Sequence, residues 1–251
     1  MAIPIGLQLY SLREDAAEDF VGVLKAVSAM GFAGVEFAGY GGLNPRELTA
    51  ILSDLNLKVA GSHVGFHQLE SELDEVLRFN AEIDNKYIIC PAPPRELLTD
   101  GGADDWKAFA HRLSAIGAKV KAQGLQLAYH NHAWEFKMLD GQYALDILFT
   151  NTDPEHVVAE IDLGWTFHAG VDPVTYLQKY KGRCPLVHIK DFKKNGPQTE
   201  VGTGDVDLAG IVATAPDVGV QWYIIETEEY NMTPKDSVKV GLENLKTVLG
   251  K

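Results

Sequence analysis

The chain has 251 residues, of which 46% are hydrophobic, and its formal net charge is −13 at pH 7. This acidic balance repels a phosphate backbone and supplies no basic stripe, which argues against nucleic acid as a partner. The N-terminus lacks the pattern of a secretory signal, and no apolar run approaches the roughly 18 residues needed to cross a bilayer, so we expect a cytoplasmic protein without a membrane partner.

Short apolar segments alternate with longer segments of helical periodicity along the whole chain. This alternation is typical of β–α units arranged around a parallel sheet. We predict eight strands, at Ile5–Leu9, Val35–Phe37, Lys58–Ser62, Tyr87–Cys90, Leu125–His130, Val157–Ile161, Leu186–Ile189 and Trp222–Ile225. We predict helices between and after them, at Ala16–Ala29, Pro45–Leu55, Glu70–Asn80, Asp104–Ala122, Tyr143–Phe149, Pro173–Lys179, Leu208–Ala213 and Pro234–Val248.

Several helix ends carry their own sequence signals. An N-cap residue followed by proline precedes three of the predicted helices, at Asn44, Asp172 and Thr233. A glycine follows three of them, at Gly31, Gly124 and Gly182, where a left-handed C-cap is favoured. These signals support the predicted order of elements.

Eight strands with eight helices predict an α/β protein of the (β/α)8 or TIM-barrel class, with a single domain over residues 1–251. A doubly wound sheet would more often show fewer strands and a glycine-rich first turn, and the first turn here, "QLYSLRED", has no glycine. No low-complexity or Pro/Gly/Ser-rich linker divides the chain. Cys90 and Cys184 lack paired metal-ligand spacing and adjoin apolar segments, so we expect reduced core residues.

Polar residues gather where four consecutive predicted strands end, and barrel enzymes build their sites at these ends. The residues are His130, Asn131, His132 and Glu135 after the fifth strand, Asp162 after the sixth, His188, Lys190 and Asp191 after the seventh, and Glu226 after the eighth. Three carboxylates and one histidine suit Mn²⁺, Mg²⁺ or Co²⁺, and Zn²⁺ as well. Each residue also has a structural alternative, such as a loop cap for Asp162 or an ion pair for Glu226.

The segment "LAYHNHAWEF" allows two interpretations. His130 and His132 would share one face of an extended strand and could bind a metal together. In a regular strand Glu135 would face the opposite way, so it joins a metal site at the barrel mouth only if the chain bends after His132. The spacing leaves both interpretations open.

Together, "GLQLYSLRE", "YHNHAWEF", "EIDLGW", "HIKDF", "VGTGDVDL" and "IIETEEY" resemble the xylose-isomerase-like barrel proteins. That family includes sugar phosphate isomerases/epimerases, ketose 3-epimerases, inosose dehydratases and 3-keto-sugar epimerases. The resemblance covers nearly the whole chain. It is specific for the superfamily and much less so for a substrate.

The resemblance implies one divalent metal ion, Mn²⁺ first, with Mg²⁺, Co²⁺ or Zn²⁺ as alternatives. The implied ligands are Glu135, Asp162, His188 and Glu226. It further implies that Glu135 and Glu226 are the catalytic acid and base, exchanging protons beside a metal-bound carbonyl.

Residues at the rim are expected to bind a small-molecule carbohydrate substrate, namely Tyr10, His63, His130, His132, Trp165, His168 and Lys190. Two positions depart from the ketose 3-epimerases: Trp165 stands where those enzymes have a substrate-binding histidine, and Lys194 where they have an arginine. The "YHNH" and "HIKD" segments are closer to members that act on 3-keto-sugars, 3-keto-glycosides or inososes. The loop "VGTGDVDL" is expected to form a lid or part of the rim.

The favoured function is therefore a metal-dependent isomerase or epimerase on a keto-sugar or related polyol. The alternative is a dehydratase or lyase on an inosose or 3-keto-glycoside. From other classes, a non-catalytic sugar-binding subunit would not require the four ligands. A DNA-repair endonuclease on this barrel would require a basic face. A homo-oligomer is compatible with the sequence.

Overall fold

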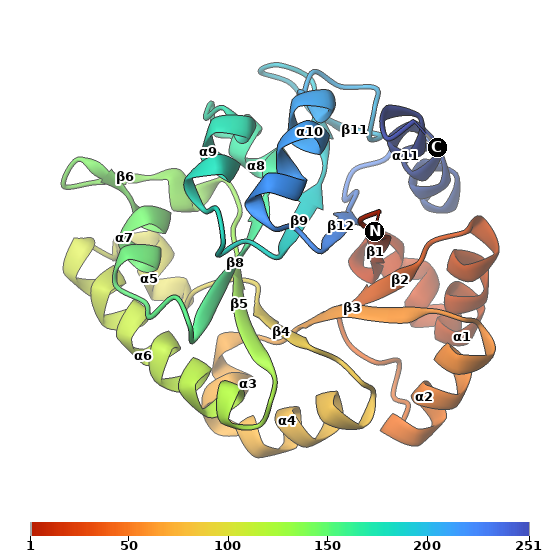
Figure 1. The fold of residues 1–251 in the computed structure, drawn as a ribbon, viewed down its shortest axis with the longest axis horizontal. Helices are drawn as coiled ribbons and strands as arrows, with labels where there is room; N and C mark the ends of the chain where they lie inside the picture. The colour runs from red at the N-terminus through yellow and green to blue at the C-terminus, as the bar shows by residue number, and fades with distance from the viewer. Residues whose placement is uncertain (1, 251) are drawn as a thin grey trace.

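The computed structural model describes residues 2–250, and in it eight parallel strands close into a barrel (Figure 1). Their order around the barrel is β1-β12-β9-β8-β5-β4-β3-β2. The strands are β1 (Ile5–Gln8), β2 (Gly34–Phe37), β3 (Lys58–His63), β4 (Tyr87–Cys90), β5 (Gln126–His130), β8 (Val157–Asp162), β9 (Leu186–Ile189) and β12 (Trp222–Ile225). All eight predicted strands and the predicted barrel are confirmed.

Helices surround the barrel on its outside (Figure 1). They are α1 (Arg13–Met30), α2 (Pro45–Asp54), α3 (Phe66–Ser71), α4 (Leu73–Glu82), α5 (Arg95–Asp100), α6 (Ala103–Ala122), α7 (Ala144–Thr150), α8 (Leu163–His168), α9 (Pro173–Lys179), α10 (Leu208–Val218) and α11 (Pro234–Val248). Two 3₁₀ turns, η1 (Leu9–Leu12) and η2 (Trp134–Phe136), follow β1 and β5. No helix in the described part of the chain is long and apolar enough to span a membrane.

Two kinds of element differ from the sequence-based expectation. The helix expected at Glu70–Asn80 is two helices, α3 and α4, because the backbone leaves the helical region at Glu72 (φ −132°, ψ 25°). Helices α5 and α8 and two short hairpins were not expected. The hairpins pair β6 (Met138–Leu139) with β7 (Gln142–Tyr143), and β10 (Asp191–Phe192) with β11 (Gln198–Thr199). Elements of two to six residues are too short to show a hydrophobic period.

The three predicted N-caps and two of the three predicted C-cap glycines are confirmed. The side chains of Asn44, Asp172 and Thr233 each accept a backbone N–H from the first turn of the following helix. Gly31 and Gly124 end α1 and α6 with left-handed backbone angles, φ 90° and 79°. Gly182 also has a positive φ of 80°, but it lies three residues past α9 and its N–H donates to Val218 O, so this predicted cap is wrong.

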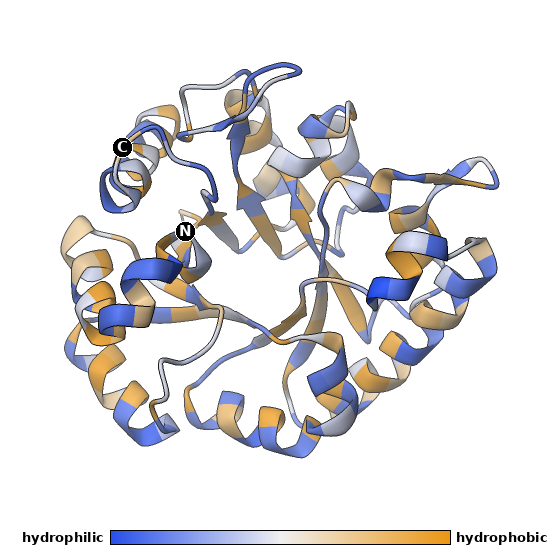
Figure 2. Cartoon of the chain, turned by 180° about the vertical axis from the view of Figure 1, so that it is seen from behind, coloured by the Kyte–Doolittle hydropathy of each residue, from blue (hydrophilic) through white to orange (hydrophobic). Residues whose placement is uncertain are grey.

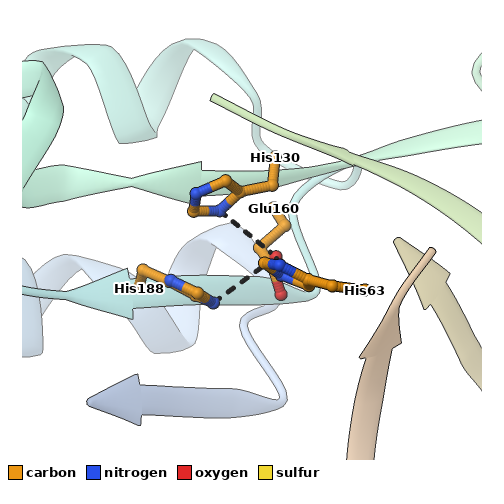
Figure 3. Close-up of side chains that lie close together, drawn as sticks. All are labelled: His63, His130, Glu160 and His188. Atoms are coloured by element: carbon orange, nitrogen blue, oxygen red, sulfur yellow. Dashed lines mark hydrogen bonds and ion pairs between the residues drawn. The ribbon is translucent and has the colours of Figure 1, made fainter. Parts of the chain in front are cut away.

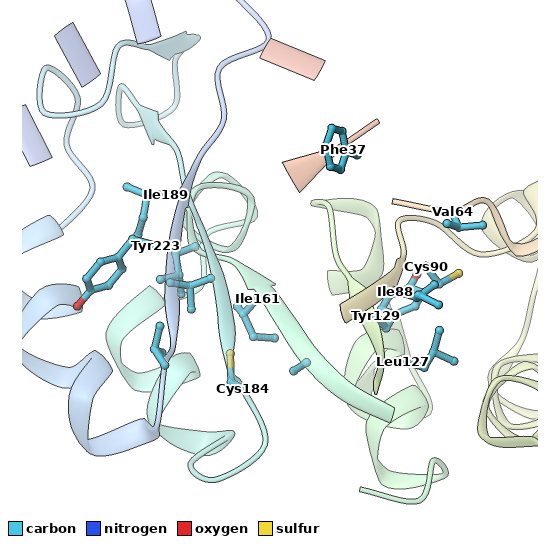
Figure 4. Close-up of a cluster of buried hydrophobic side chains, with 14 of the residues drawn as sticks. Phe37, Val64, Ile88, Cys90, Leu127, Tyr129, Ile161, Cys184, Ile189 and Tyr223 are labelled. Carbon is cyan, nitrogen blue, oxygen red and sulfur yellow. The ribbon is translucent and has the colours of Figure 1, made fainter. Parts of the chain in front are cut away.

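The apolar core has two layers. Figure 2 shows hydrophobic and hydrophilic residues alternating along the outer helices, as expected where one helix face packs on the sheet. The larger layer lies between sheet and helices and includes Ile88, Tyr129 and Ile161 (Figure 4). Cys90 and Cys184 belong to it as buried free thiols, which confirms their predicted core role. A smaller apolar cluster is formed by Ala60, Tyr87, Ile89, Ala128, Leu186 and Ile224.

The smaller cluster forms an apolar floor inside the barrel, and polar side chains lie above it. Successive residues of a strand face opposite sides, so Ala128 and His130 share the inner face of β5, and Leu186 and His188 share that of β9. In both strands the apolar residue comes first and the imidazole follows towards the carboxyl end. The fold therefore places a buried polar layer at the carboxyl ends of the strands.

Candidate metal centre

Four side chains from neighbouring strands offer metal-ligand atoms that all lie within 4.8 Å of one another: His130, Asp162, His188 and Glu226. The Nδ1 atom of His188 lies 2.8 Å from Glu226 Oε2 and 3.8 Å from Asp162 Oδ2. The Nε2 atom of His130 lies 4.0 Å from the same Asp162 oxygen. The structure thus brings together three of the four predicted metal ligands, and His130 completes the group.

Glu135, the fourth predicted ligand, does not belong to this group. The chain does bend after His132, into η2, and the Glu135 carboxylate is fully buried. It accepts hydrogen bonds from the Tyr129 hydroxyl and the His132 backbone N–H, both at 2.8 Å. Burial raises the pKa of Glu135 to about 7. Its role as a ligand and base stays a prediction.

Lys190 extends its ammonium group among the carboxylates of the site. Its Nζ atom lies 3.0 Å from Glu226 Oε2 and 3.3 Å from Asp162 Oδ2, and it also donates to Glu228. The whole side chain is buried. Burial opposes the charge on Lys190, but Asp162 and the two glutamates raise its pKa above the usual range. This lysine therefore balances part of the negative charge of the site, together with His188.

A second buried group lies next to the first and was not predicted as a unit: His63, His130, Glu160 and His188. Figure 3 shows the three imidazole rings gathered around the Glu160 carboxylate. Glu160 Oε2 lies 3.0 Å from His63 Nε2, 3.3 Å from His130 Nδ1 and 3.4 Å from His188 Nε2. Glu36 adjoins them, with its Oε2 atom 2.7 Å from His188 Nε2 and 3.0 Å from His63 Nε2.

The ionisation of these groups follows from burial and mutual attraction. Burial alone would lower the pKa of His188, but the Glu160 and Glu36 carboxylates raise it well above its usual value. Burial beside other cations lowers the pKa of His130 well below its usual value. Burial raises the pKa of Asp162 to about 6, while Lys190 opposes the rise. For Glu226 burial also acts upward, yet Lys190 and His188 hold its pKa below the usual range.

The predicted substrate-binding residues divide into those at the cluster and those outside it. His63, His130 and Lys190 lie in the buried network described above. The His132 ring is 4.9 Å from the His130 ring, and Lys190 Nζ lies 4.9 Å from the centre of the Trp165 ring. Tyr10 and His168 are exposed, with His168 packed edge-on against Trp165 and Tyr10 beneath Arg13. Their contact with a substrate stays a prediction.

Glu36 and Glu160 are the site residues that strand-end reasoning missed, because both lie within strands and not beyond them. A usable signal was present for Glu160, since it precedes Asp162 by two residues and so shares its face of β8. Glu36 stands between Val35 and Phe37, and this apolar context gives no sequence signal that it belongs to a polar site. Only closure of the barrel brings β2 and β8 to the same imidazoles.

The residues present fit a divalent cation. Asp162 Oδ2 is buried and makes no hydrogen bond, although Lys190 lies within ion-pair distance of it. Two imidazole nitrogens and two carboxylates form a borderline donor set, which suits Mn²⁺, Fe²⁺, Co²⁺ and Zn²⁺. The cluster is therefore consistent with a metal site, and the donor set leaves the identity of the metal open.

A sequence profile of the xylose isomerase-like TIM-barrel family matches residues 24–248. The match covers most of the chain, so the chain belongs to this family, as its motifs predicted. A sugar phosphate isomerase/epimerase from Parabacteroides distasonis ATCC 8503 superposes with a TM-score of 0.82 at 26% identity, covering 96% of this chain and 97% of that one. An L-ribulose 3-epimerase superposes with a TM-score of 0.73 at 15% identity over 99% of this chain and 96% of the other, which shows the shared fold alone.

Curated relatives with similar sequences include inosose dehydratases. The protein from Lacticaseibacillus casei is 28% identical over an alignment of 145 residues, and the match covers 50% of this chain and 48% of that protein. The matched region thus spans about half the length of that relative. The protein from Geobacillus kaustophilus strain HTA426 is 24% identical over 246 residues, covering 82% of this chain and 79% of the dehydratase.

Proposed function

We propose that this protein is a divalent-metal-dependent isomerase or epimerase that acts on a keto-sugar or related polyol. The reaction begins with removal of a proton from the carbon next to a carbonyl. The observation that carries the proposal is the buried group His130, Asp162, His188 and Glu226 at the carboxyl ends of neighbouring barrel strands. Family membership supports it, because relatives with this barrel include proteins named as sugar isomerases/epimerases and inosose dehydratases.

Asp162, His188 and Glu226 would hold the metal, with His130 or the predicted Glu135 as the fourth ligand. When bound, a divalent cation polarises a substrate carbonyl and so acidifies the neighbouring C–H group. The placement of His130 in the cluster favours it over Glu135 as that ligand. We expect Mn²⁺ first, with Mg²⁺, Co²⁺ and Zn²⁺ as alternatives.

Two glutamates are proposed to move the proton. Lys190 and His188 hold Glu226 ionised, so its carboxylate is free of a proton, but their positive charge makes it a weaker base than an ordinary carboxylate. Glu135 has a pKa raised to about 7, which suits a group that both gives and accepts protons near neutral pH. The assignment of both glutamates rests on the resemblance, and for Glu135 also on its raised pKa.

Polar atoms at the mouth of the barrel are available to the hydroxyls of a sugar. His132 Nδ1 and Trp165 Nε1 are buried and make no hydrogen bond within the described chain. A buried donor or acceptor without a partner costs about 1 to 3 kcal/mol, and a substrate hydroxyl would remove that cost. This supports the proposed substrate-binding role of both residues, beside Lys190.

A dehydratase acting on an inosose is the second candidate. The specific observation in its favour is that the curated relatives with similar sequences include inosose dehydratases. Elimination of water also begins by removal of a proton next to a carbonyl, so the same glutamates would serve. The two candidate reactions differ only in the next step: an epimerase returns a proton to the carbon, whereas a dehydratase releases water.

One experiment separates these outcomes. The Mn²⁺-loaded protein is incubated in D₂O with a panel of ketoses, inososes and 3-keto-glycosides, and the products are followed by NMR after removal of the metal. We expect deuterium at the carbon next to the carbonyl, together with an epimer for an epimerase or an unsaturated product for a dehydratase. The matched control is Glu226→Gln, which should show neither. Absence of deuterium from every compound tested would contradict the proposal and favour a non-catalytic sugar-binding protein.

A further inference from the structure

The imidazole rings of His130 and His188 lie between two pairs of buried carboxylates. One pair is Asp162 and Glu226, from the proposed metal site, and the other is Glu36 and Glu160, deeper in the barrel. His188 presents Nδ1 to the first pair, 2.8 Å from Glu226, and Nε2 to the second, 2.7 Å from Glu36. His130 faces the same two pairs at longer range, with Nε2 4.0 Å from Asp162 and Nδ1 3.3 Å from Glu160, and neither contact is a hydrogen bond.

A neutral imidazole carries one ring proton, and only its other nitrogen has a lone pair for a metal. A carboxylate accepts hydrogen bonds and donates none, so it favours a proton on the nitrogen that faces it. Histidine ligands of metals usually donate their second ring N–H to such a partner. The deeper carboxylates therefore favour protons on His188 Nε2 and His130 Nδ1, which leaves the upper nitrogens free to bind a cation.

The two deeper carboxylates are themselves held in place. Glu36 Oε2 accepts a hydrogen bond from Gln8 Nε2 at 2.7 Å, and His63 Nε2 lies 3.0 Å from both Glu36 and Glu160. Both glutamates are completely buried, so water does not compete for their oxygens. Strands β1, β2 and β3 thus hold Glu36 in place, and Glu160 lies on β8, between the strands that carry the two rings.

We propose that Glu36 and Glu160 are positioning residues that fix the ring tautomers of His188 and His130, so that Nδ1 of His188 and Nε2 of His130 face the divalent cation. This inference rests on the proposed metal site. It assigns a function to two residues that lie outside the group of His130, Asp162, His188 and Glu226.

The test compares Zn²⁺ affinity across a set of variants, by competition with a chromophoric chelator. Removing such a partner typically lowers metal affinity about 10- to 100-fold, and we expect this loss for Glu36→Gln and a loss of similar size for Glu160→Gln. Glu36→Asp retains the charge and should recover part of the affinity. The control is Asp146→Asn, which alters a carboxylate bonded to Tyr176 and Tyr180 outside the barrel and should change affinity less than twofold.

A second readout needs no variant. Long-range ¹H–¹⁵N NMR of the Zn²⁺-loaded wild-type protein should show the ring proton of His188 on Nε2, with Nδ1 bound to zinc. The reverse tautomer, or undiminished affinity in Glu36→Gln and Glu160→Gln, would overturn the inference while leaving the metal site standing. A wild-type protein that binds no Zn²⁺, Mn²⁺ or Co²⁺ would instead overturn the proposed function, and this inference with it.

Discussion

Lys190 competes with a metal for the carboxylates of the site, because its ammonium group contacts the same oxygens that a metal would need. Asp162 Oδ2 and Glu226 Oε2 lie within 3.3 Å of Nζ, and the side chain has no exposure to solvent. Two unit charges 4 Å apart interact by about 4 kcal/mol at an effective dielectric constant of 20. Metal binding therefore requires Lys190 to withdraw from these oxygens, and Glu228 remains as its partner.

Lys190→Met should raise the affinity for Mn²⁺ at least tenfold, which corresponds to about 1.4 kcal/mol and is well within that electrostatic term. The metal-free variant should lose about 3 to 5 kcal/mol of stability, since buried carboxylates are left without their counter-charge. Chelator competition measures the first effect, and urea unfolding in EDTA measures the second.

The matched control for that substitution is Lys194→Met, which removes the same charge from an exposed position. It should leave both quantities close to those of the wild type. If Lys190→Met binds Mn²⁺ more weakly than the wild type, the lysine supports the metal and does not compete with it.

Among the elements, the turn at residues 202–206 is bonded to the carboxylate of Asp191, just after β9. Asp191 accepts backbone N–H groups from Gly202 and Gly204 at 2.9 Å each and from Val206 at 3.1 Å. These bonds fasten the turn that follows the β10–β11 hairpin. A Cβ atom at Gly204 would lie 2.0 Å from Asp191 Oδ1, so the close approach requires glycine there.

Asp191→Ala should release this turn, because three of its backbone N–H groups lose their acceptor, and the buried Val206 N–H alone costs about 1 to 3 kcal/mol when left without one. We expect faster hydrogen–deuterium exchange over residues 200–206 and new proteolytic cleavage in that segment. Asp172→Ala serves as the comparison, since it removes a cap of α9 and should leave exchange in the turn unchanged. Equal exchange in Asp191→Ala and the wild type would show that other contacts hold the turn.

The elements also show where sequence reasoning is strong. Strands such as Leu186–Ile189 were located to the residue because a short β-branched run between turn residues has few alternatives. Asp162 and His188 could be predicted as site residues because they lie at strand ends, where a barrel gathers its functional side chains. The orientation of Glu135 was not predictable, because it depends on a one-turn 3₁₀ segment and on the Tyr129 hydroxyl, which lies six residues earlier in the chain.

At the scale of the whole molecule, closure of the barrel creates what no local pattern contains. Glu36 and His188 are 152 residues apart, yet their side chains are hydrogen-bonded across the interior. The net charge of −13 does not distinguish acidic residues on the surface from those buried in the barrel. Burying these polar side chains lowers the stability of the fold unless they pair with one another or with a cation. The buried polar layer therefore indicates a functional site and not a role in packing the core.

We propose that the buried cluster at the mouth of this barrel binds a divalent metal through Asp162, His188 and Glu226. The most direct test is the metal content of purified protein after loading with Mn²⁺ and gel filtration, measured by mass spectrometry of the metal. We predict one equivalent per chain in the wild type and close to none in Asp162→Ala/Glu226→Ala, with circular dichroism confirming that the variant is folded. One equivalent of Mn²⁺ retained in the folded double variant would show that Asp162 and Glu226 do not hold the metal.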